Sequence, residues 1–159
     1  MALRSLCITE GADRPTVATF IGMHDAGVGI TVVCPDDHPN FKVLEEAGVP
    51  VIDIRLTRNF DRDGTEALRR ELERGHYDIV HTFNSRALTN GLAASKGLDL
   101  KFIAYRGIVG NLSFLDPMSW KRYLNPRIDR IVCVCEAIRR WVLEMRPAFL
   151  RMPADRPVT

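Results

Sequence analysis

Short apolar runs alternate with helix-like stretches of about ten residues along most of this 159-residue chain. The runs that are typical of strands lie at residues 3–9, 30–34, 49–54, 77–82, 100–105 and 129–134. Helices are expected between them, at residues 16–26, 40–47, 63–75 and 86–96, and after the last run at 136–145. Such repeated alternation selects a parallel sheet covered by helices on both faces. We therefore predict a single α/β domain with a Rossmann-like, doubly wound parallel sheet.

The composition is that of an ordinary globular protein, with 46% hydrophobic and 26% charged residues. A chain of this length can bury one substantial core. No apolar run approaches the roughly 18 residues that a membrane span needs, and the N-terminus leads directly into a strand rather than a signal peptide. We therefore expect a cytoplasmic protein.

The net charge of +2 is too small to indicate a nucleic-acid partner. Its distribution is uneven, because residues 121–159 carry nine Lys or Arg against four Asp or Glu. A basic segment of this kind suits phosphates or an anionic membrane surface, and it is equally typical of a solvated helix face. The first alternative would place the protein peripherally at the inner face of a membrane.

Cysteine usage gives no sign of a metal centre or of disulfides. The four residues Cys7, Cys34, Cys133 and Cys135 lie in or at the ends of apolar runs, and no Cys-x-x-Cys pair occurs. We predict four buried free thiols and no metal site.

Several families of enzymes are excluded by missing motifs. The turn after the first strand runs from Glu10 to Thr16 with one glycine, so the Gly-x-Gly-x-x-Gly fingerprint of dinucleotide binding is absent, as is a Gly-Lys-Ser/Thr P-loop. A receiver domain is excluded because Arg106 stands where its lysine would be. Gly-x-Ser-x-Gly is also absent, so we assign no catalytic residue.

Polar residues follow the fourth strand, where open parallel sheets form their ligand crevices. His81 comes at the end of that strand, and Asn84, Arg86 and Asn90 follow at the entry of the next helix. An imidazole, amides and a guanidinium can bind hydroxyls or a phosphate. His81 also fits an interior hydrogen-bonded histidine, and Asn84 fits a helix cap.

The fifth strand ends at Arg106, which Gly107 and Gly110 flank and Asn111 follows. A guanidinium offers a fixed fork for a carboxylate or phosphate, here beside accessible backbone amides. The alternative is an ion pair with a loop carboxylate such as Asp116.

The connection from residue 108 to residue 125 is too long for an ordinary turn, and long connections in compact domains tend to be functional. Its aromatic and apolar residues interleave with Lys121 and Arg122. This mixture suits a sugar face, a lipid tail or a bilayer interface, so Trp120 is a candidate binding residue. Core packing of the same aromatic residues is the alternative.

Three segments carry a resemblance to a known family. They are His24–Val33, similar to a Gly-His-x-Val-x-Val strand entry, then Tyr77–His81, and finally Asp129–Ile138. In their order and spacing they resemble the N-terminal domain of glycosyltransferase family 4 enzymes, in which two Rossmann-like domains face each other in the GT-B fold. The resemblance covers nearly the whole chain.

The resemblance implies an acceptor-binding domain at residues 1–147 and a linker at 148–159 to a missing C-terminal donor domain. It implies a retaining, metal-independent transfer from a nucleotide sugar to a cell-envelope or lipid-linked glycan. The nucleotide sugar is expected on the donor domain, this domain is expected to hold no cofactor, and the chain alone is expected to be inactive. The alternatives are a non-enzymatic Rossmann-like module that binds a phosphorylated or acidic ligand through Arg106, and a subunit that pairs with a separate donor chain.

The same resemblance implies that three segments line the substrate cleft. They are the loop at Gly11 with Arg14 and Thr16, the turn after His81, and the segment at Arg106. The family's Thr-x-His-Gly at the end of the fifth strand is replaced here, so no histidine role is transferred to Arg106. The spacing of Glu136 and Glu144 imitates a donor-site glutamate pair, but its Gly-Phe-Gly context is absent, and we interpret it as a coincidence.

Overall fold

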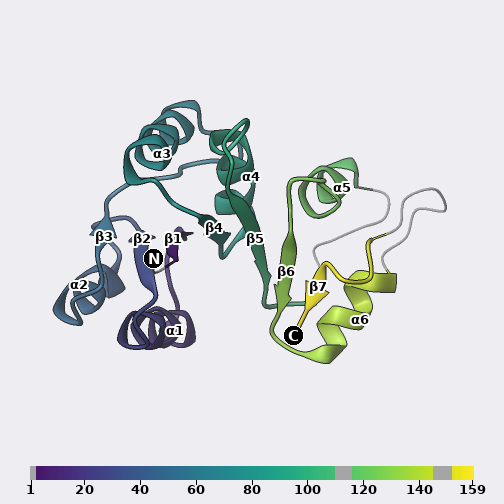
Figure 1. Cartoon of the computed structure of the whole chain (residues 1–159), viewed down its shortest axis with the longest axis horizontal. Helices are drawn as coiled ribbons and strands as arrows, with labels where there is room; N and C mark the ends of the chain where they lie inside the picture. The colour runs from purple at the N-terminus through teal and green to yellow at the C-terminus, as the bar shows by residue number, and fades with distance from the viewer. Residues whose placement is uncertain (1–2, 110–115, 145–151) are drawn as a thin grey trace. The chain divides into compact units, whose positions relative to one another are not determined.

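The structure is a computed structural model that describes residues 3–109, 116–144 and 152–159, apart from the side chain of Trp120. Two compact units divide the chain, at residues 1–100 (unit 1) and 101–159 (unit 2). In Figure 1 unit 1 runs from purple to teal, and unit 2 from green to yellow. Each unit is built by alternating strands and helices.

Residues 3–100, the described part of unit 1, form four strands and four helices. The strands are β1 (Arg4–Ile8), β2 (Gly29–Val33), β3 (Val51–Ile52) and β4 (Ile79–Thr82), and the helices are α1 (Arg14–Asp25), α2 (Pro39–Glu46), α3 (Arg62–Gly75) and α4 (Ser85–Ala94). The strands pair in parallel in the order β3-β2-β1-β4. Ile8 lies opposite both Val33 and Thr82, and Val33 lies opposite Ile52. All four strands therefore end at the same edge of the sheet.

Helices cover both faces of the strands of unit 1. Figure 1 shows α1 and α2 on one side and α3 and α4 on the other. Beneath α1 and α2 lies a buried cluster that includes Phe20, Val32 and Leu44. The ring of Phe20 meets the ring of Phe83 edge to face, with 4.8 Å between the ring centroids. The strand and helix faces therefore share one apolar core, as the sequence pattern predicts.

The helix starts differ from two of our expectations. Asp13, three residues before the predicted start at residue 16, caps α1, because its carboxylate accepts a hydrogen bond from the Thr16 backbone at 3.0 Å. Asp61, two residues before the predicted start at residue 63, caps α3, because its carboxylate accepts a hydrogen bond from the Gly64 backbone at 3.0 Å. In each case an aspartate with an extended backbone lies before the predicted start of the helix, and aspartate is favoured at the N-cap position.

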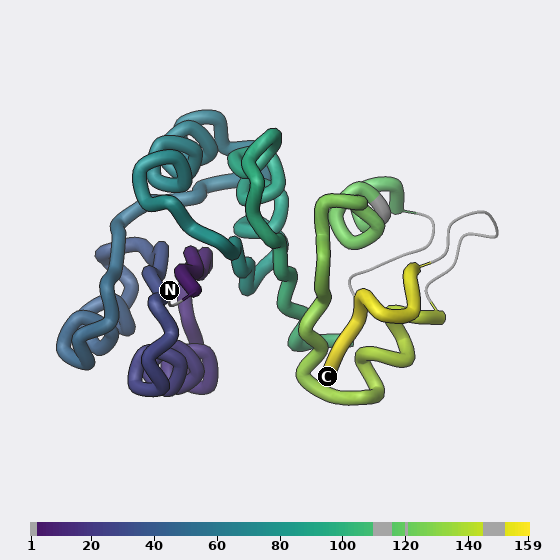
Figure 2. The backbone as a smooth tube through the Cα atoms, viewed as in Figure 1, coloured from purple at the N-terminus to yellow at the C-terminus, as the bar shows by residue number. Residues whose placement is uncertain are grey.

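The described residues of unit 2 form three strands and two helices. They are β5 (Lys101–Arg106), α5 (Pro117–Tyr123), β6 (Arg130–Cys133), α6 (Glu136–Glu144) and β7 (Pro157–Val158). The strands pair in parallel in the order β5-β6-β7, and Figure 2 shows the yellow β7 segment beside β6. Part of the segment that we expected as linker, residues 157–158, therefore belongs to this sheet. That a donor domain follows stays a prediction.

The core of unit 2 is apolar and includes Phe102, Tyr123 and Ile131. Tyr123 is buried, so this member of the aromatic series in residues 108–125 packs inside unit 2, as the core-packing alternative expects. The prediction of four buried thiols is wrong for Cys135, which follows β6 and is exposed. The other three cysteines are buried, and all four are free.

The predicted fold class is confirmed, because both units pair their strands in parallel and cover them with helices. Among the helices of the described residues, none combines the length and apolar character that a membrane span requires. Left-handed glycines end three helical segments where the sequence places them, at Gly27, Gly48 and Gly97.

Two glycines near the end of α1 provide a matched test of the backbone. Gly27 has φ +79°, whereas a Cβ added to Gly22, inside the helix, would meet nothing within 4 Å. We expect Gly27→Ala to lower the free energy of unfolding by roughly 1–2 kcal/mol and Gly22→Ala to raise it by up to about 1 kcal/mol. Urea unfolding curves of both variants measure this. Equal effects of the two substitutions would contradict the assigned helix end.

Candidate functional site

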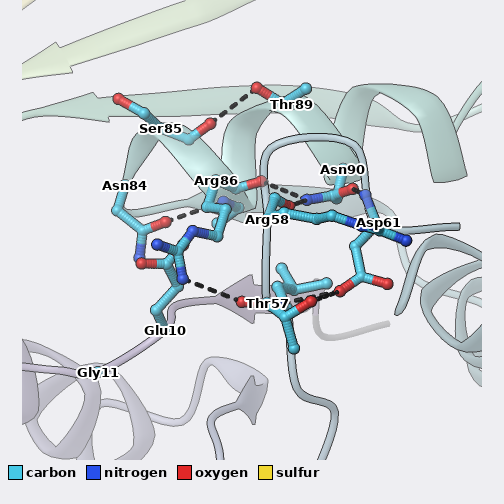
Figure 3. Close-up of polar contacts among 12 residues, drawn as sticks. Glu10, Gly11, Thr57, Arg58, Asp61, Asn84, Ser85, Arg86, Thr89 and Asn90 are labelled. Atoms are coloured by element: carbon cyan, nitrogen blue, oxygen red, sulfur yellow. Dashed lines mark hydrogen bonds and ion pairs between the residues drawn. The ribbon is translucent and has the colours of Figure 1, made fainter. Parts of the chain in front are cut away.

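Four loops meet at the edge of unit 1 where its strands end. They follow β1, β2, β3 and β4 and comprise residues 9–13, 34–38, 53–61 and 83–84. Figure 3 shows polar side chains from three of these loops and from α4 in contact with one another. In open parallel sheets ligands bind beyond the carboxyl ends of the strands. We call this edge with its four loops the carboxyl edge of unit 1.

An ion pair joins α4 to the first loop. The Nε atom of Arg86 lies 2.8 Å from a carboxylate oxygen of Glu10, and the side chains are 41% and 29% exposed. The same guanidinium donates a hydrogen bond to the carbonyl of Leu56 at 3.2 Å. Arg86 therefore links α4 to the loops after β1 and β3. Partial burial raises the pKa of Glu10, and the nearby charge of Arg86 opposes this shift.

Thr9 and Asn84 fix the backbone at Gly11. The Thr9 hydroxyl donates to the Gly11 carbonyl at 3.0 Å and accepts from its N–H at 3.3 Å. Asn84 donates to the same hydroxyl at 3.5 Å, and its carbonyl oxygen accepts from the Ala87 backbone at 2.8 Å. The capping alternative for Asn84 is therefore confirmed.

The loop after β2 lies against the loop after β1. A Cβ added to Gly11 would stand 2.6 Å from Nε2 of His38, so the imidazole occupies the space that any side chain at residue 11 would need. Nδ1 of His38 accepts from the Asn40 backbone at 3.2 Å and caps α2. A glycine at residue 11 thus permits close packing of two loops at the carboxyl edge.

The side chain of Asn90, on α4, holds the loop after β3 by hydrogen bonds. It is 1% exposed, and its carbonyl oxygen accepts from the Asp61 backbone and the Thr65 hydroxyl, each at 2.9 Å. Its amide donates to the carbonyls of Arg58 at 3.0 Å and Arg86 at 2.9 Å. The expectation that Asn90 binds a ligand is therefore wrong, because its hydrogen-bonding capacity is used inside the protein.

Asp61 closes the same loop on itself. One carboxylate oxygen accepts from both the backbone and the hydroxyl of Thr57, each at 2.7 Å (Figure 3). The other caps α3. The hydrogen bonds from the Gly64 and Thr57 backbones, together with the Thr57 hydroxyl, lower the pKa of Asp61 to about 2. A charged aspartate thus fixes both ends of the exposed segment 57–60.

His81 is the penultimate residue of β4 and lies opposite Cys7 of β1. Its ring packs on Phe83, with 4.2 Å between centroids. Within the part of the chain that the structure describes, its buried Nε2 atom has no hydrogen-bond partner. Burial lowers the pKa of His81 to about 4, so the imidazole is neutral near pH 7.

The remaining predicted residues of unit 1 lie at the start of α1. Arg14 is the first helical residue and is exposed, and Thr16 is half-buried in the first turn. Both follow directly from the loop that contains Gly11. The structure therefore brings Gly11, Asn84 and Arg86 together, with Arg14 and Thr16 on the adjoining helix turn.

Arg106 lies in unit 2 and is 5% exposed. Its guanidinium donates to the Tyr123 hydroxyl at 3.3 Å and lies 5.5 and 5.7 Å from the ring centroids of Tyr123 and Trp141. Asp116, the alternative ion-pair partner, accepts hydrogen bonds from the Ser119 hydroxyl and from the start of α5. These contacts place Arg106 between aromatic rings, in a cation–π arrangement.

Three other predictions in unit 2 concern Gly107, Asn111 and Trp120. Gly107 follows β5, and a Cβ there would lie 2.9 Å from the ring of Tyr105. Asn111 and the side chain of Trp120 lie outside the described residues. Their roles in binding stay predictions.

Glu10 is the residue at this edge that sequence reasoning passed over. The signal was available, because Glu10 directly follows the predicted first strand, where side chains reach the ligand edge. Across residues 3–109, 116–144 and 152–159, no group of three or more His, Cys, Asp or Glu side chains could hold a metal ion. The carboxyl edge instead offers a half-exposed carboxylate, a guanidinium and fixed backbone groups.

Comparison with models of known protein families gives a match. The family model described as Glycosyltransferase Family 4 matches residues 10–151. The chain belongs to this family. None of the curated proteins compared with it matches.

Solved structures show the same fold at low identity. A glycosyltransferase from Rickettsia africae is 17% identical with a TM-score of 0.75, and covers 99% of this chain with 42% of its own. Anabaena Alr3699/HepE in complex with UDP is 12% identical with a TM-score of 0.70 and coverages of 99% and 43%. A UDP-N-acetylglucosamine 2-epimerase from Rickettsia bellii is 13% identical with a TM-score of 0.63 and coverages of 99% and 44%. The family 4 chain thus spans less than half the length of these structures, which show its fold alone.

The four hydrogen bonds of Asn90 predict a large effect of its removal. Asn90→Ala leaves the backbone groups of Asp61, Arg58 and Arg86 and the Thr65 hydroxyl without these partners, so we expect the free energy of unfolding to fall by about 3 kcal/mol. Chemical denaturation measures this. Asn59→Ala, in the exposed part of the same loop, is the control and should change stability by less than about 0.5 kcal/mol. An effect of Asn90→Ala as small as the control would contradict the anchoring role.

The low pKa of Asp61 predicts acid sensitivity. Because the pKa of Asp61 in the folded protein is about 2, below its usual value of 3.8, ionised Asp61 stabilises the fold above pH 4, and this contribution is lost as the pH falls toward 2. In Asp61→Asn, which can still cap α3, the decline in unfolding free energy between pH 4 and pH 2 should be shallower than in the wild type. Asp25→Asn, an exposed residue at the end of α1, serves as the control. Identical acid profiles for wild type and Asp61→Asn would disprove the assigned contacts.

Proposed function

We propose that this chain is the acceptor-binding, N-terminal half of a GT-B glycosyltransferase, and that it works with a C-terminal domain that binds a nucleotide sugar. The complete enzyme would transfer the sugar, with retention and without a metal ion, to a cell-envelope or lipid-linked glycan. The observation that carries the proposal is the family 4 match over residues 10–151. The coverage of 42% to 44% of the compared structures supports the assignment to one half of such an enzyme.

The carboxyl edge of unit 1 is the proposed acceptor site. Glu10 and Arg86 are partly exposed there, beside backbone that Thr9 and Asn84 hold in place. A carboxylate accepts hydrogen bonds from sugar hydroxyls, and a guanidinium donates to hydroxyl or phosphate oxygens. The chemistry of the edge suits a polyhydroxylated or phosphorylated acceptor, because it presents both a hydrogen-bond acceptor and a charged hydrogen-bond donor.

The alternative of a non-enzymatic module draws no support from unit 2. That interpretation uses Arg106 as a fork for an acidic ligand, whereas the described contacts of its guanidinium are with Tyr123 and Trp141. The more exposed guanidinium of Arg86 is the better candidate for ligand binding.

Ligand-induced stabilisation tests the acceptor role. We expect the melting temperature of this chain to rise with glucose 1-phosphate or with short glycans, and to be unchanged by UDP-glucose, because the nucleotide site is assigned to the other domain. Arg86→Gln should reduce the rise. Arg140→Gln is a matched control, since Arg140 on α6 also pairs with a glutamate, Glu136.

Stabilisation by UDP-glucose alone would contradict the proposal, because it would place donor binding on this chain. Stabilisation by glycans that Arg86→Gln and Arg140→Gln reduce equally would contradict the assignment to the carboxyl edge. The retaining outcome is tested separately, by determining the anomeric configuration of the product that the complete enzyme forms.

A further inference from the structure

An exposed aromatic ring lies on the carboxyl edge of unit 1, in the loop between β3 and α3. Phe60 is 68% exposed, although its neighbour Asp61 is buried. Exposure of a single phenylalanine is common on protein surfaces. What distinguishes this one is the contrast between an exposed segment, residues 57–60, and the buried polar groups that hold its two ends.

The loop backbone is fixed from three directions. Asp61 accepts from the backbone and hydroxyl of Thr57, Asn90 accepts from the Asp61 backbone and donates to the Arg58 carbonyl, and Arg86 donates to the Leu56 carbonyl. Figure 3 shows these contacts converging on the segment from Thr57 to Asp61. A loop held in this way presents its outward side chains with little entropy left to lose on binding.

Most of the charges around this loop are paired, and the exposed Arg58 lies near the charged Asp61. Arg55 pairs with Asp37 at 2.8 Å and Asp36 at 3.4 Å, and Arg62 pairs with Glu66 at 3.3 Å. At the same edge, Arg86 pairs with Glu10. Binding to an anionic bilayer depends on an excess of unpaired basic groups together with a sizeable apolar face. The surroundings of Phe60 provide a single ring and mostly neutralised arginines.

An uncharged ligand with one apolar face fits such a surface better. The C–H groups on one face of a pyranose ring can pack on an aromatic ring, while its hydroxyls reach polar groups at the margin. The half-exposed carboxylate of Glu10 supplies acceptors of that kind on the same edge. An aromatic ring and a carboxylate on a fixed backbone are the groups that carbohydrate binding needs.

We propose that Phe60 is the stacking platform for a sugar ring of the acceptor. This inference rests on the proposed function, which it deepens by naming the acceptor subsite and the part of the ligand that occupies it. The loop between β3 and α3 then sets acceptor specificity, because a sugar whose apolar face is interrupted by an axial hydroxyl stacks less well on the ring.

Substitutions at Phe60 can distinguish whether the exposed ring binds a sugar or contacts a membrane. Binding of methyl β-glucoside and of cellobiose to the whole chain is measured by saturation-transfer NMR, and binding to vesicles of phosphatidylglycerol and phosphatidylethanolamine by co-sedimentation. Phe60→Ala and Phe60→Leu should each weaken sugar binding about tenfold, whereas Phe60→Trp should retain it. Leucine is the decisive variant, because it keeps the apolar surface that a bilayer needs but lacks the flat ring.

Val43→Ala is the matched control, since Val43 is an exposed apolar residue on α2 of the same unit. It should leave sugar binding unchanged. Unfolding curves of all Phe60 variants should match the wild type, because the ring is mostly exposed, so that a loss of binding reports on contact rather than on folding.

The outcomes distinguish this inference from the proposed function. If Arg86→Gln weakens sugar binding while Phe60→Ala and Phe60→Leu do not, the stacking platform is wrong and the acceptor role stands. Vesicle binding that Phe60→Leu retains and Phe60→Ala loses, with sugar binding unaffected, would overturn the inference in favour of a membrane contact. If the wild-type chain binds neither sugar at millimolar concentration, the acceptor role fails and the inference with it.

Discussion

The parallel register of four strands is the constraint on which the candidate site depends. Because Ile8 lies opposite both Val33 and Thr82, the chain leaves β1, β2 and β4 at the same level, and β3 ends beside β2. Residues that are far apart in the sequence, such as Glu10 and Arg86, can meet only because of this alignment. A shift of one residue in any strand would turn its side chains to the opposite face and separate the loops.

Buried polar groups convert this gathering of loops into a defined surface. Hydrophobic packing positions the helices, but it is not directional and does not determine the course of a loop. At the carboxyl edge the direction comes from Asp61 and Asn90, whose oxygen atoms and amide group are occupied by backbone and side-chain partners of the loop between β3 and α3. The exposed residues of this loop are therefore held by groups that are themselves inaccessible to a ligand.

The sequence predicts the fold well because strand and helix periodicities act locally and repeat many times. It predicts the site less completely, since contacts between loops depend on side chains that carry no pattern of their own. Asn84 and Arg86 could be placed from their position after a strand, whereas the burial of Asn90, four residues after Arg86 on α4, depends on where α3 packs. Arg106 shows the same limit, because its aromatic neighbours come from two helices that follow it in the chain.

Arg86 and Arg106 both follow or end a strand, but their surroundings differ. Position at a strand end is therefore not sufficient to make an arginine a ligand-binding residue. Arg106 contacts two aromatic rings, which take the place of water beside a delocalised charge, and the residue is 5% exposed. Arg86 is balanced by one carboxylate and remains accessible, so a ligand hydroxyl or phosphate can approach the pair without displacing a packed ring. The cost of engaging each guanidinium therefore differs, and the partly exposed pair of Glu10 and Arg86 is the one at which binding requires the smaller rearrangement of the protein.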